Sequence, residues 1–192
     1  YHNMDMQQRM AANQGQKEAI ARYIVGMIEE NDTIMFNAGT TTLAVFRMLP
    51  AKMNLSIVTN SIAIAVEASA NPNFNVVLLG GSVNPKYQFI YGADAIMQLE
   101  RYYADKLILS VDGITLENGL TSFYNHEVEL DRIMLTHASS KIVAADSTKL
   151  GRTAFTRIAD ISMPDYIITN NDPATQEELE QLRQTDQNII AV

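Results

Sequence analysis

The feature that most constrains the fold of this chain is the alternation of short apolar runs with segments of helical periodicity. Runs at 33–36, 106–111 and 141–146 carry apolar side chains at successive positions, which is typical of strands buried on both faces. Segments 16–30 and 127–138 instead space their apolar residues three or four positions apart, as helices do. Strands that alternate with helices in this way predict an α/β fold, a mostly parallel sheet with helices on both faces.

The same alternation continues along the chain without a Pro-, Gly- or Ser-rich linker. We expect one domain over 16–192, preceded by a linker or N-terminal helix at 1–15, with a small inserted lobe near 112–140. Further strands are expected at 55–59, 74–80, 165–169 and 188–192, and further helices at 61–70, 93–103 and 175–184.

The composition disfavours several classes of protein. The 192 residues are 47% hydrophobic and 19% charged, which is ordinary for a globular protein. The net charge of -8 argues against nucleic-acid binding by this chain itself, because phosphate backbones require clustered Lys and Arg. There is no cysteine, and the scattered histidines His2, His126 and His137 do not predict a metal site. Without a membrane-length apolar run or a signal peptide, we expect a soluble, cytoplasmic protein.

Small, polar or glycine residues follow five of the expected strands. In open α/β sheets, ligands bind at the carboxyl ends of the strands. We therefore expect ligand-binding residues where these segments meet at one edge of the sheet. The segments are Asn37-Ala38-Gly39-Thr40-Thr41-Thr42, Thr59-Asn60-Ser61, Gly80-Gly81-Ser82, Asp112-Gly113-Ile114 and Asp146-Ser147-Thr148-Lys149.

The turn at Gly39, Thr40 and Thr41 has the features of a phosphate-binding site. A glycine lets the backbone approach a ligand closely, and the amides at the start of a helix attract anions. Neither a Walker A loop nor a dinucleotide-binding G-x-G-x-x-G motif is present. The alternative is that a threonine only caps the helix.

Two other strand-end pairs have a structural interpretation that competes with ligand binding. Asn60-Ser61 precedes a helical segment, where such residues often serve as N-caps. Gly80-Gly81 is also compatible with a tight turn. The aromatic residues Tyr87, Phe89 and Tyr91 can line a pocket, but core packing is the simpler expectation.

Three charged residues complete the candidate site. An acid such as Asp112, at a strand end, can bind the hydroxyl groups of a sugar, and the alternative is that Asp112-Gly113 only forms a turn. Glu127 opens a helix, where acids also suit the helix macrodipole, so a structural and a ligand role remain open. Lys149 lies on a glycine-bearing loop, where its charge can balance a phosphate in an otherwise acidic chain.

The order and spacing of these motifs resemble a known family. The series QKEAIA, NAGTTT, IVTNS, LLGGSV, VDGI, NGLT, HEVELDRIM and AADSTKLG is similar to the C-terminal effector domain of the DeoR family of bacterial sugar-metabolism repressors, from about Arg9 to Val192. The resemblance implies a fold related to ribose-5-phosphate isomerase and CoA transferases, a phosphorylated sugar as effector, and no cofactor. It also implies a homo-oligomer and an N-terminal winged helix-turn-helix that reads operator DNA, which is absent from this sequence.

The resemblance also assigns residues to the site. Asn37 stands where an aspartate is usual, and Asp131 stands where a lysine is common. These departures bear on the identity of the effector rather than on the fold. The ligand-binding residues that it implies are Asn37, Gly39, Thr40, Thr41, Asn60, Gly80, Gly81, Asp112, Gly113, Glu127 and Lys149.

Three classes of function remain to be separated. The leading interpretation is a non-catalytic sensor whose ligand changes the arrangement of subunits. The alternative is a sugar-phosphate isomerase or transferase on the same fold, with Asp112 or Glu127 as base and Lys149 stabilising the enediolate. A pure oligomerisation module is the third interpretation, and it leaves the polar strand ends without a purpose.

Overall fold

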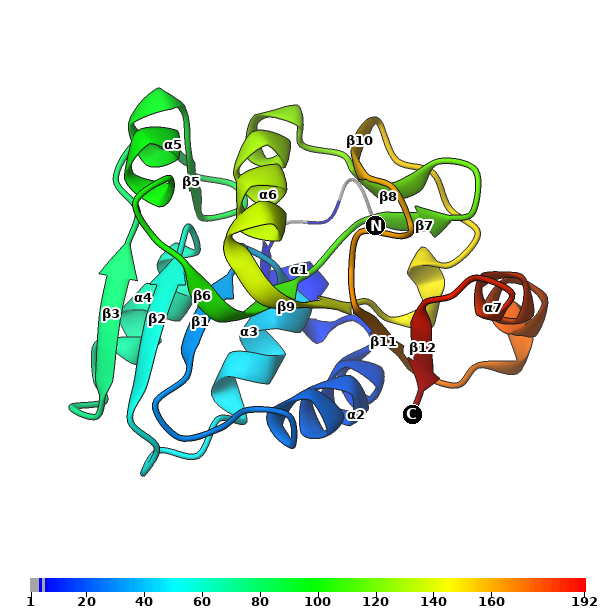
Figure 1. Ribbon diagram of the computed structural model, residues 1–192, viewed down its shortest axis with the longest axis horizontal. Coiled ribbons are helices and arrows are strands. Elements are labelled where there is room, and N and C mark those ends of the chain that lie inside the picture. The colour runs from blue at the N-terminus through cyan, green and yellow to red at the C-terminus, as the bar shows by residue number, and fades with distance from the viewer. Residues whose placement is uncertain (1–3, 5) are drawn as a thin grey trace.

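Seven parallel strands form the central sheet of the protein (Figure 1). The computed structural model describes residue 4 and residues 6–192. The strand order is β12-β11-β9-β6-β1-β2-β3, and every neighbouring pair is parallel, so the predicted α/β fold is confirmed. The strands of this sheet are β1 (Thr33–Phe36), β2 (Leu55–Thr59), β3 (Phe74–Leu78), β6 (Ala104–Leu109), β9 (Ala138–Ala144), β11 (Tyr166–Thr169) and β12 (Asn188–Ala191).

Helices cover both faces of this sheet, as the sequence pattern predicts. Helices α2, α3 and α4 contribute apolar side chains to the core on one face, and α5, α6 and α7 contribute to the core on the other. The helices are α1 (Met6–Ala11), α2 (Gln14–Val25), α3 (Thr40–Arg47), α4 (Ile62–Ala68), α5 (Ala93–Leu99), α6 (Asn125–His137) and α7 (Gln176–Arg183), with short 3-10 turns η1 (Ser147–Lys149) and η2 (Pro173–Thr175).

The two cores arise from the alternation of side chains along each strand. In β1, Ile34 and Phe36 point into the core beneath α2 and α3, whereas Met35 points into the opposite core. All three side chains are fully buried. Because successive side chains of a strand face opposite sides, a run without polar residues is what a central strand covered on both faces requires.

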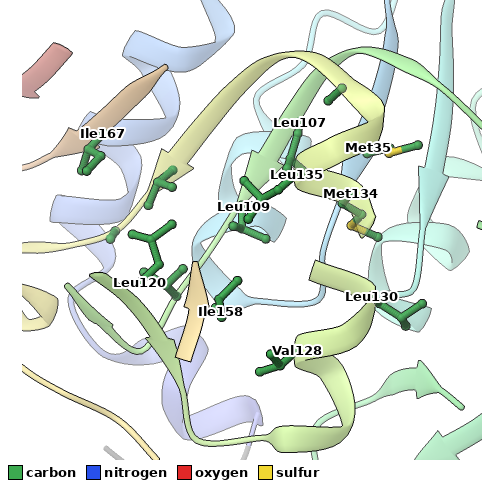
Figure 2. Close-up of a cluster of buried hydrophobic side chains, with 14 of the residues drawn as sticks. Met35, Leu107, Leu109, Leu120, Val128, Leu130, Met134, Leu135, Ile158 and Ile167 are labelled. Carbon is green, nitrogen blue, oxygen red and sulfur yellow. The ribbon is translucent and has the colours of Figure 1, made fainter. Parts of the chain in front are cut away.

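Helix α6 supplies much of the core on its face of the sheet. Figure 2 shows Val128, Leu130, Met134 and Leu135 of this helix gathered with side chains from the sheet, including Leu107 of β6. Leu120 and Ile158, from a second small sheet, join the same cluster (Figure 2). The position of α6 over the sheet places its first turns beside the carboxyl ends of the central strands.

Two small antiparallel sheets were not predicted from the sequence. The first is the hairpin of β4 (Ser82–Asn84) and β5 (Phe89–Tyr91). The second joins β7 (Gly113–Thr115), β8 (Gly119–Ser122) and β10 (Thr156–Ala159). Most of these strands mix polar or glycine residues with apolar ones over three or four positions, so they lack the continuous apolar run that marks short strands of the central sheet such as β1. The lobe expected near 112–140 stays a prediction, since β7, β8 and α6 lie in this range but β10 does not.

The central position of β6 gives the first prediction. Replacing Leu107 with Ala removes a fully buried side chain from the core under α6, and such a cavity costs ~2–5 kcal/mol. We expect the free energy of unfolding in urea to fall by about this amount. The control is Leu116→Ala at an exposed position, where ~0.5 kcal/mol or less is expected. Equal effects of the two substitutions would contradict the described core.

Candidate functional site

A pocket lies where the strand order reverses. From β1 the chain proceeds outward through β2 and β3, and it then returns to place β6 on the other side of β1. The carboxyl ends of β1 and β6 therefore diverge into separate connections, which is where open α/β sheets bind ligands. The residues that line the pocket are Met6, Arg9, Ala38, Gly39, Thr40, Thr41, Tyr87, Phe89, Ser110, Val111, Asp112, Ser122, Tyr124, Glu127, Asp131 and Lys149.

The turn from β1 into α3 presents backbone to this pocket. Gly39 is the N-cap residue of α3 and no side chain caps this helix end, so the first amides have no intrahelical partner. A Cβ on Gly39 would overlap the Oγ of Ser110 and lie 2.9 Å from its Cβ. The φ of -176° at Gly39 is extended backbone that any residue adopts. Glycine is therefore needed at position 39 because a larger residue would clash with Ser110, and not because of the backbone conformation.

Asn37 lies beneath the pocket and joins the two diverging strands. Its Nδ2 donates to the carbonyl oxygen of Ser110 at 3.0 Å, and its Oδ1 accepts from the amide of Ser110 at 2.8 Å. The same Nδ2 also donates to Oδ1 of Asp131 at 3.1 Å. Asn37 is 2% exposed, and it does not line the pocket among the residues that the structure describes.

The two departures from the family pattern contact each other through this hydrogen bond. An aspartate at position 37 would set one carboxylate against another, whereas the amide of Asn37 donates to Asp131. Burial raises the pKa of Asp131 to about 8, against the hydrogen bond from Asn37, which lowers it. The pair is therefore a neutral amide and a protonated acid at neutral pH.

Glu127 lies one helical turn before Asp131 on the buried side of α6. Burial raises its pKa well above the ordinary value, and the nearby Asp131 and Asp112 raise it further. Nδ2 of Asn60 lies 3.5 Å from Oε1 of Glu127. Burial thus favours the protonated form of the Glu127 carboxyl group, which can both donate and accept hydrogen bonds.

Asp112 is the acid with a cationic partner. Its Oδ1 accepts from Nη2 of Arg9 at 2.7 Å. Its Oδ2 accepts from the amide of Phe123 at 3.1 Å and from Oγ of Ser122 at 3.3 Å. These contacts fix the carboxylate between the end of β6 and the end of β8.

Lys149 lies in η1 and is 4% exposed, although the loop position suggested by the sequence favours exposure. Burial lowers the pKa of Lys149 to about 8, while the carboxylates of Asp146 and Asp112 act in the opposite direction. The lysine therefore remains mainly protonated at pH 7. It brings a positive charge to the wall of the pocket.

The predicted site residues divide into two groups. Gly39, Thr40, Thr41, Asp112, Glu127 and Lys149 line the pocket together. Within the described part of the chain, its lining does not include Asn37, Asn60, Gly80, Gly81 or Gly113.

The residues away from the pocket have structural contacts. Asn60 accepts from the amide of Ala38 at 2.9 Å, and Ser61 is the N-cap of α4 through a bond from the amide of Ile64. A Cβ on Gly81 would lie 2.6 Å from the carbonyl oxygen of Tyr91. One on Gly113 would overlap the carbonyl oxygen of Arg152. These glycines permit close packing of the small sheets.

Sequence reasoning missed several residues of the pocket wall, above all Arg9, Ser110, Ser122 and Tyr124. Ser110 directly follows β6, two residues before Asp112, and was within reach of the same argument. Arg9 and Tyr124 have no local pattern, because tertiary packing alone brings them to the pocket. The expectation of core packing was incomplete for Tyr87 and Phe89, since both are buried and both also line the pocket.

The fold and the pocket define an α/β domain with a pocket lined by polar and charged side chains at the topological switch point. Sequence comparison identifies the family. A profile described as the DeoR C terminal sensor domain matches residues 12–171, and the chain belongs to this family. The family resemblance seen in the motifs is thereby confirmed.

Named relatives are regulators of transcription. The chain is 32% identical over 163 residues to the HTH-type transcriptional regulator GolR of Listeria innocua, which covers 85% of this chain and 64% of that protein. It is 30% identical over 171 residues to the glycerol-3-phosphate regulon repressor of Escherichia coli, covering 89% of this chain and 68% of the relative. The chain thus spans somewhat less than two thirds of the length of GolR.

A solved structure shows the relation of the fold. Ribose 5-phosphate isomerase A from Methanocaldococcus jannaschii superposes with a TM-score of 0.53 at 15% identity, over 72% of this chain and 55% of that one. The predicted relation to the ribose-5-phosphate isomerase fold is confirmed. Across residue 4 and residues 6–192, no helix combines the length and the apolar character that crossing a membrane requires.

The buried acids predict how stability depends on pH. Between pH 5 and 7.5 the folded state holds a proton on Asp131 that the unfolded state has released, so the free energy of unfolding falls as pH rises. Asp131→Asn has no such proton. We expect the free energy of unfolding of this variant to fall less steeply with pH than that of wild type, by ~1.4 kcal/mol per pH unit. Urea unfolding at pH 5, 6 and 7 measures both slopes.

The control is Glu129→Gln, which removes an exposed carboxyl group from the same helix. The lowered pKa of Lys17 and of Lys149 affects stability only above about pH 8, outside this window. Parallel pH profiles of wild type and Asp131→Asn would contradict a protonated Asp131 in the folded state.

Proposed function

We propose that this chain is the effector-binding part of a transcriptional repressor of sugar metabolism, and that its effector is a phosphorylated sugar. The observation that carries the proposal is the uncapped start of α3, which opens into a pocket shared with two cations and a fixed carboxylate. An anion suits the first part of this arrangement, and sugar hydroxyl groups suit the second.

The phosphate end of the ligand is assigned to Gly39, Thr40 and Thr41. Amides at a helix start bind anions through unsatisfied N–H groups and the helix dipole. Lys149 lines the same pocket and supplies a charge-assisted partner, worth roughly 1.5–3 kcal/mol.

The sugar end is assigned to Asp112 and Glu127. The carboxylate of Asp112 accepts hydrogen bonds from Ser122 and Phe123 in addition to Arg9. We assign to it the role of accepting hydrogen bonds from hydroxyl groups of the sugar. The protonated carboxyl of Glu127 adds a donor and an acceptor. Asn37, Asn60, Gly80, Gly81 and Gly113 are proposed to act on the ligand indirectly, by shaping the strand ends.

The remaining properties of the whole protein follow from the family. We propose that operator DNA is recognised by an N-terminal winged helix-turn-helix outside these 192 residues, in a cytoplasmic homo-oligomer that needs no cofactor. The relatives are HTH-type regulators or repressors. The net charge of -8 on this chain supports the assignment of DNA binding to another segment.

The buried acids favour a sensor over an isomerase. Removal of a proton beside a carbonyl requires a carboxylate base in its ionised form. Burial raises the pKa of Glu127 well above its ordinary value and that of Asp131 to about 8, which disfavours their ionised forms, and Asp112 is paired with Arg9. The likeness to ribose 5-phosphate isomerase extends to the fold alone, so an isomerase or transferase activity is the alternative that the experiment must test.

A ligand panel separates the two functions. We expect at least one of glucose 6-phosphate, fructose 6-phosphate, ribose 5-phosphate and glycerol 3-phosphate to raise the melting temperature of the chain. The unphosphorylated parent compounds are expected to give little or no shift, because they lack the anion. NMR of the same mixtures is expected to show no conversion of the ligand. Conversion would establish the enzyme instead, and the absence of any shift across a broad sugar-phosphate panel would contradict the sensor.

Gly39 offers a direct test of the phosphate assignment. We expect Gly39→Ala to weaken binding of the active sugar phosphate by about tenfold or more, ~1.4 kcal/mol per decade. The added Cβ displaces the Ser110 side chain or the turn itself. The control is Gly15→Ala, where a Cβ meets open space. Calorimetric titration measures the affinities, and melting curves verify folding. Equal affinity of wild type and Gly39→Ala would refute the assignment.

A further inference from the structure

The pocket contains a charged side chain, Arg9, that is not among the candidate site residues of the sequence analysis. Arg9 of α1 reaches the pocket, and its Nη2 donates to Asp112 at 2.7 Å. Its guanidinium carbon lies 5.6 Å from the ring centres of Tyr87 and of Tyr124. The side chains of Arg9 and Asp112 are 12% and 11% exposed. A residue distant in sequence from every strand end is therefore part of the ligand site.

The turn between α1 and α2 holds Arg9 in this place. Nζ of Lys17, a residue 2% exposed, donates to the carbonyl oxygens of Arg9 at 2.5 Å and of Ala12 at 2.7 Å. Nδ2 of Asn13 lies 3.4 Å from Oδ1 of Asp146, at the start of the segment that carries Lys149. Hydrogen bonds thus hold the turn between α1 and α2 against the domain beside the pocket.

The pocket is narrow with Arg9 inside. Its cavity measures about 40 Å³, and one water needs ~10–15 Å³, so the enclosed space holds a few waters. Movement of the Arg9 side chain away from Asp112 would enlarge the space for a ligand. A second cavity of about 380 Å³ lies between α1, α2 and α3 and shares Thr40 with the first, which leaves α1 room to shift.

The charges of the pocket indicate where the guanidinium goes. Burial raises the pKa of Glu127 well above its ordinary value and that of Asp131 to about 8, which favours their neutral forms. The wall also carries the ion pair of Asp112 with Arg9, and Lys149. A phosphate dianion requires more than one cation, and a guanidinium presents a fork that matches two phosphate oxygens.

We propose that Arg9 is a ligand-binding residue of this site, which leaves Asp112 and takes the phosphate of the bound sugar together with Lys149. The inference rests on the proposed function and deepens it. The carboxylate of Asp112, once released, is available to the sugar hydroxyl groups. Because Arg9 belongs to α1, occupancy of the pocket changes the position and the exchange behaviour of α1. The N-terminal helix thereby senses the ligand directly.

The test uses the full 192-residue chain and the ligands of the panel, with inorganic phosphate as a probe of the anion alone. Calorimetry compares wild type with Arg9→Ala and with Arg9→Lys, which keeps the charge but loses the fork. The control is Arg22→Ala, an exposed cation of α2. We expect Arg9→Ala to weaken binding of the sugar phosphate about tenfold or more, Arg9→Lys to weaken it less, and Arg22→Ala to stay within twofold of wild type.

A second readout follows α1 itself. Amide hydrogen exchange over residues 6–13 is expected to slow when wild type binds the sugar phosphate, and to stay unchanged by ligand in Arg9→Ala. Equal or tighter binding by Arg9→Ala would overturn the proposal and leave the proposed function standing. Failure of every panel member to bind wild type would overturn the proposed function and this inference with it. If Arg9→Ala does not fold, wild-type exchange that ligand leaves unchanged would decide against the proposal.

Discussion

The structure of the site depends on one constraint, the divergence of β1 and β6 at their carboxyl ends. These two strands are neighbours, but the chain continues from them into different halves of the sheet. The space between the two connections must be bridged where the strands end, and it must stay accessible to a ligand further from the sheet. Asn37 closes it through paired hydrogen bonds with the backbone of Ser110, and Gly39 leaves it open because it lacks a side chain.

Burial determines the protonation and pairing of the acidic side chains in the pocket. Three acids lie close together on its wall, and three buried negative charges would oppose both folding and anion binding. Burial raises the pKa of Glu127 and of Asp131, which favours their neutral forms, and the third acid, Asp112, is paired with Arg9. Asn37 belongs to the same arrangement, since its side-chain amide donates to Asp131. The wall of the pocket in this way avoids three neighbouring negative charges in an acidic chain.

The sequence predicted the sheet and its helices because those elements depend on periodic burial, which Ile34, Met35 and Phe36 display directly. It also predicted the part of the pocket that follows strand ends, such as Gly39 and Asp112. It could not predict that Arg9 lines the pocket, because no local sequence pattern indicates that α1 packs beside the pocket. Nor did it predict that Lys149 is buried, since this depends on how η1 packs.

The central claim is that the turn at the start of α3 binds the phosphate of a sugar. The most direct measurement is a crystal structure of the chain with a phosphorylated sugar that raises its melting temperature. The account predicts phosphate oxygens within hydrogen-bonding distance of the amides of Thr40 and Thr41, with the sugar directed toward Asp112. A phosphate bound beside Gly80 and Gly81, or in the groove between α1, α2 and α3, would contradict it.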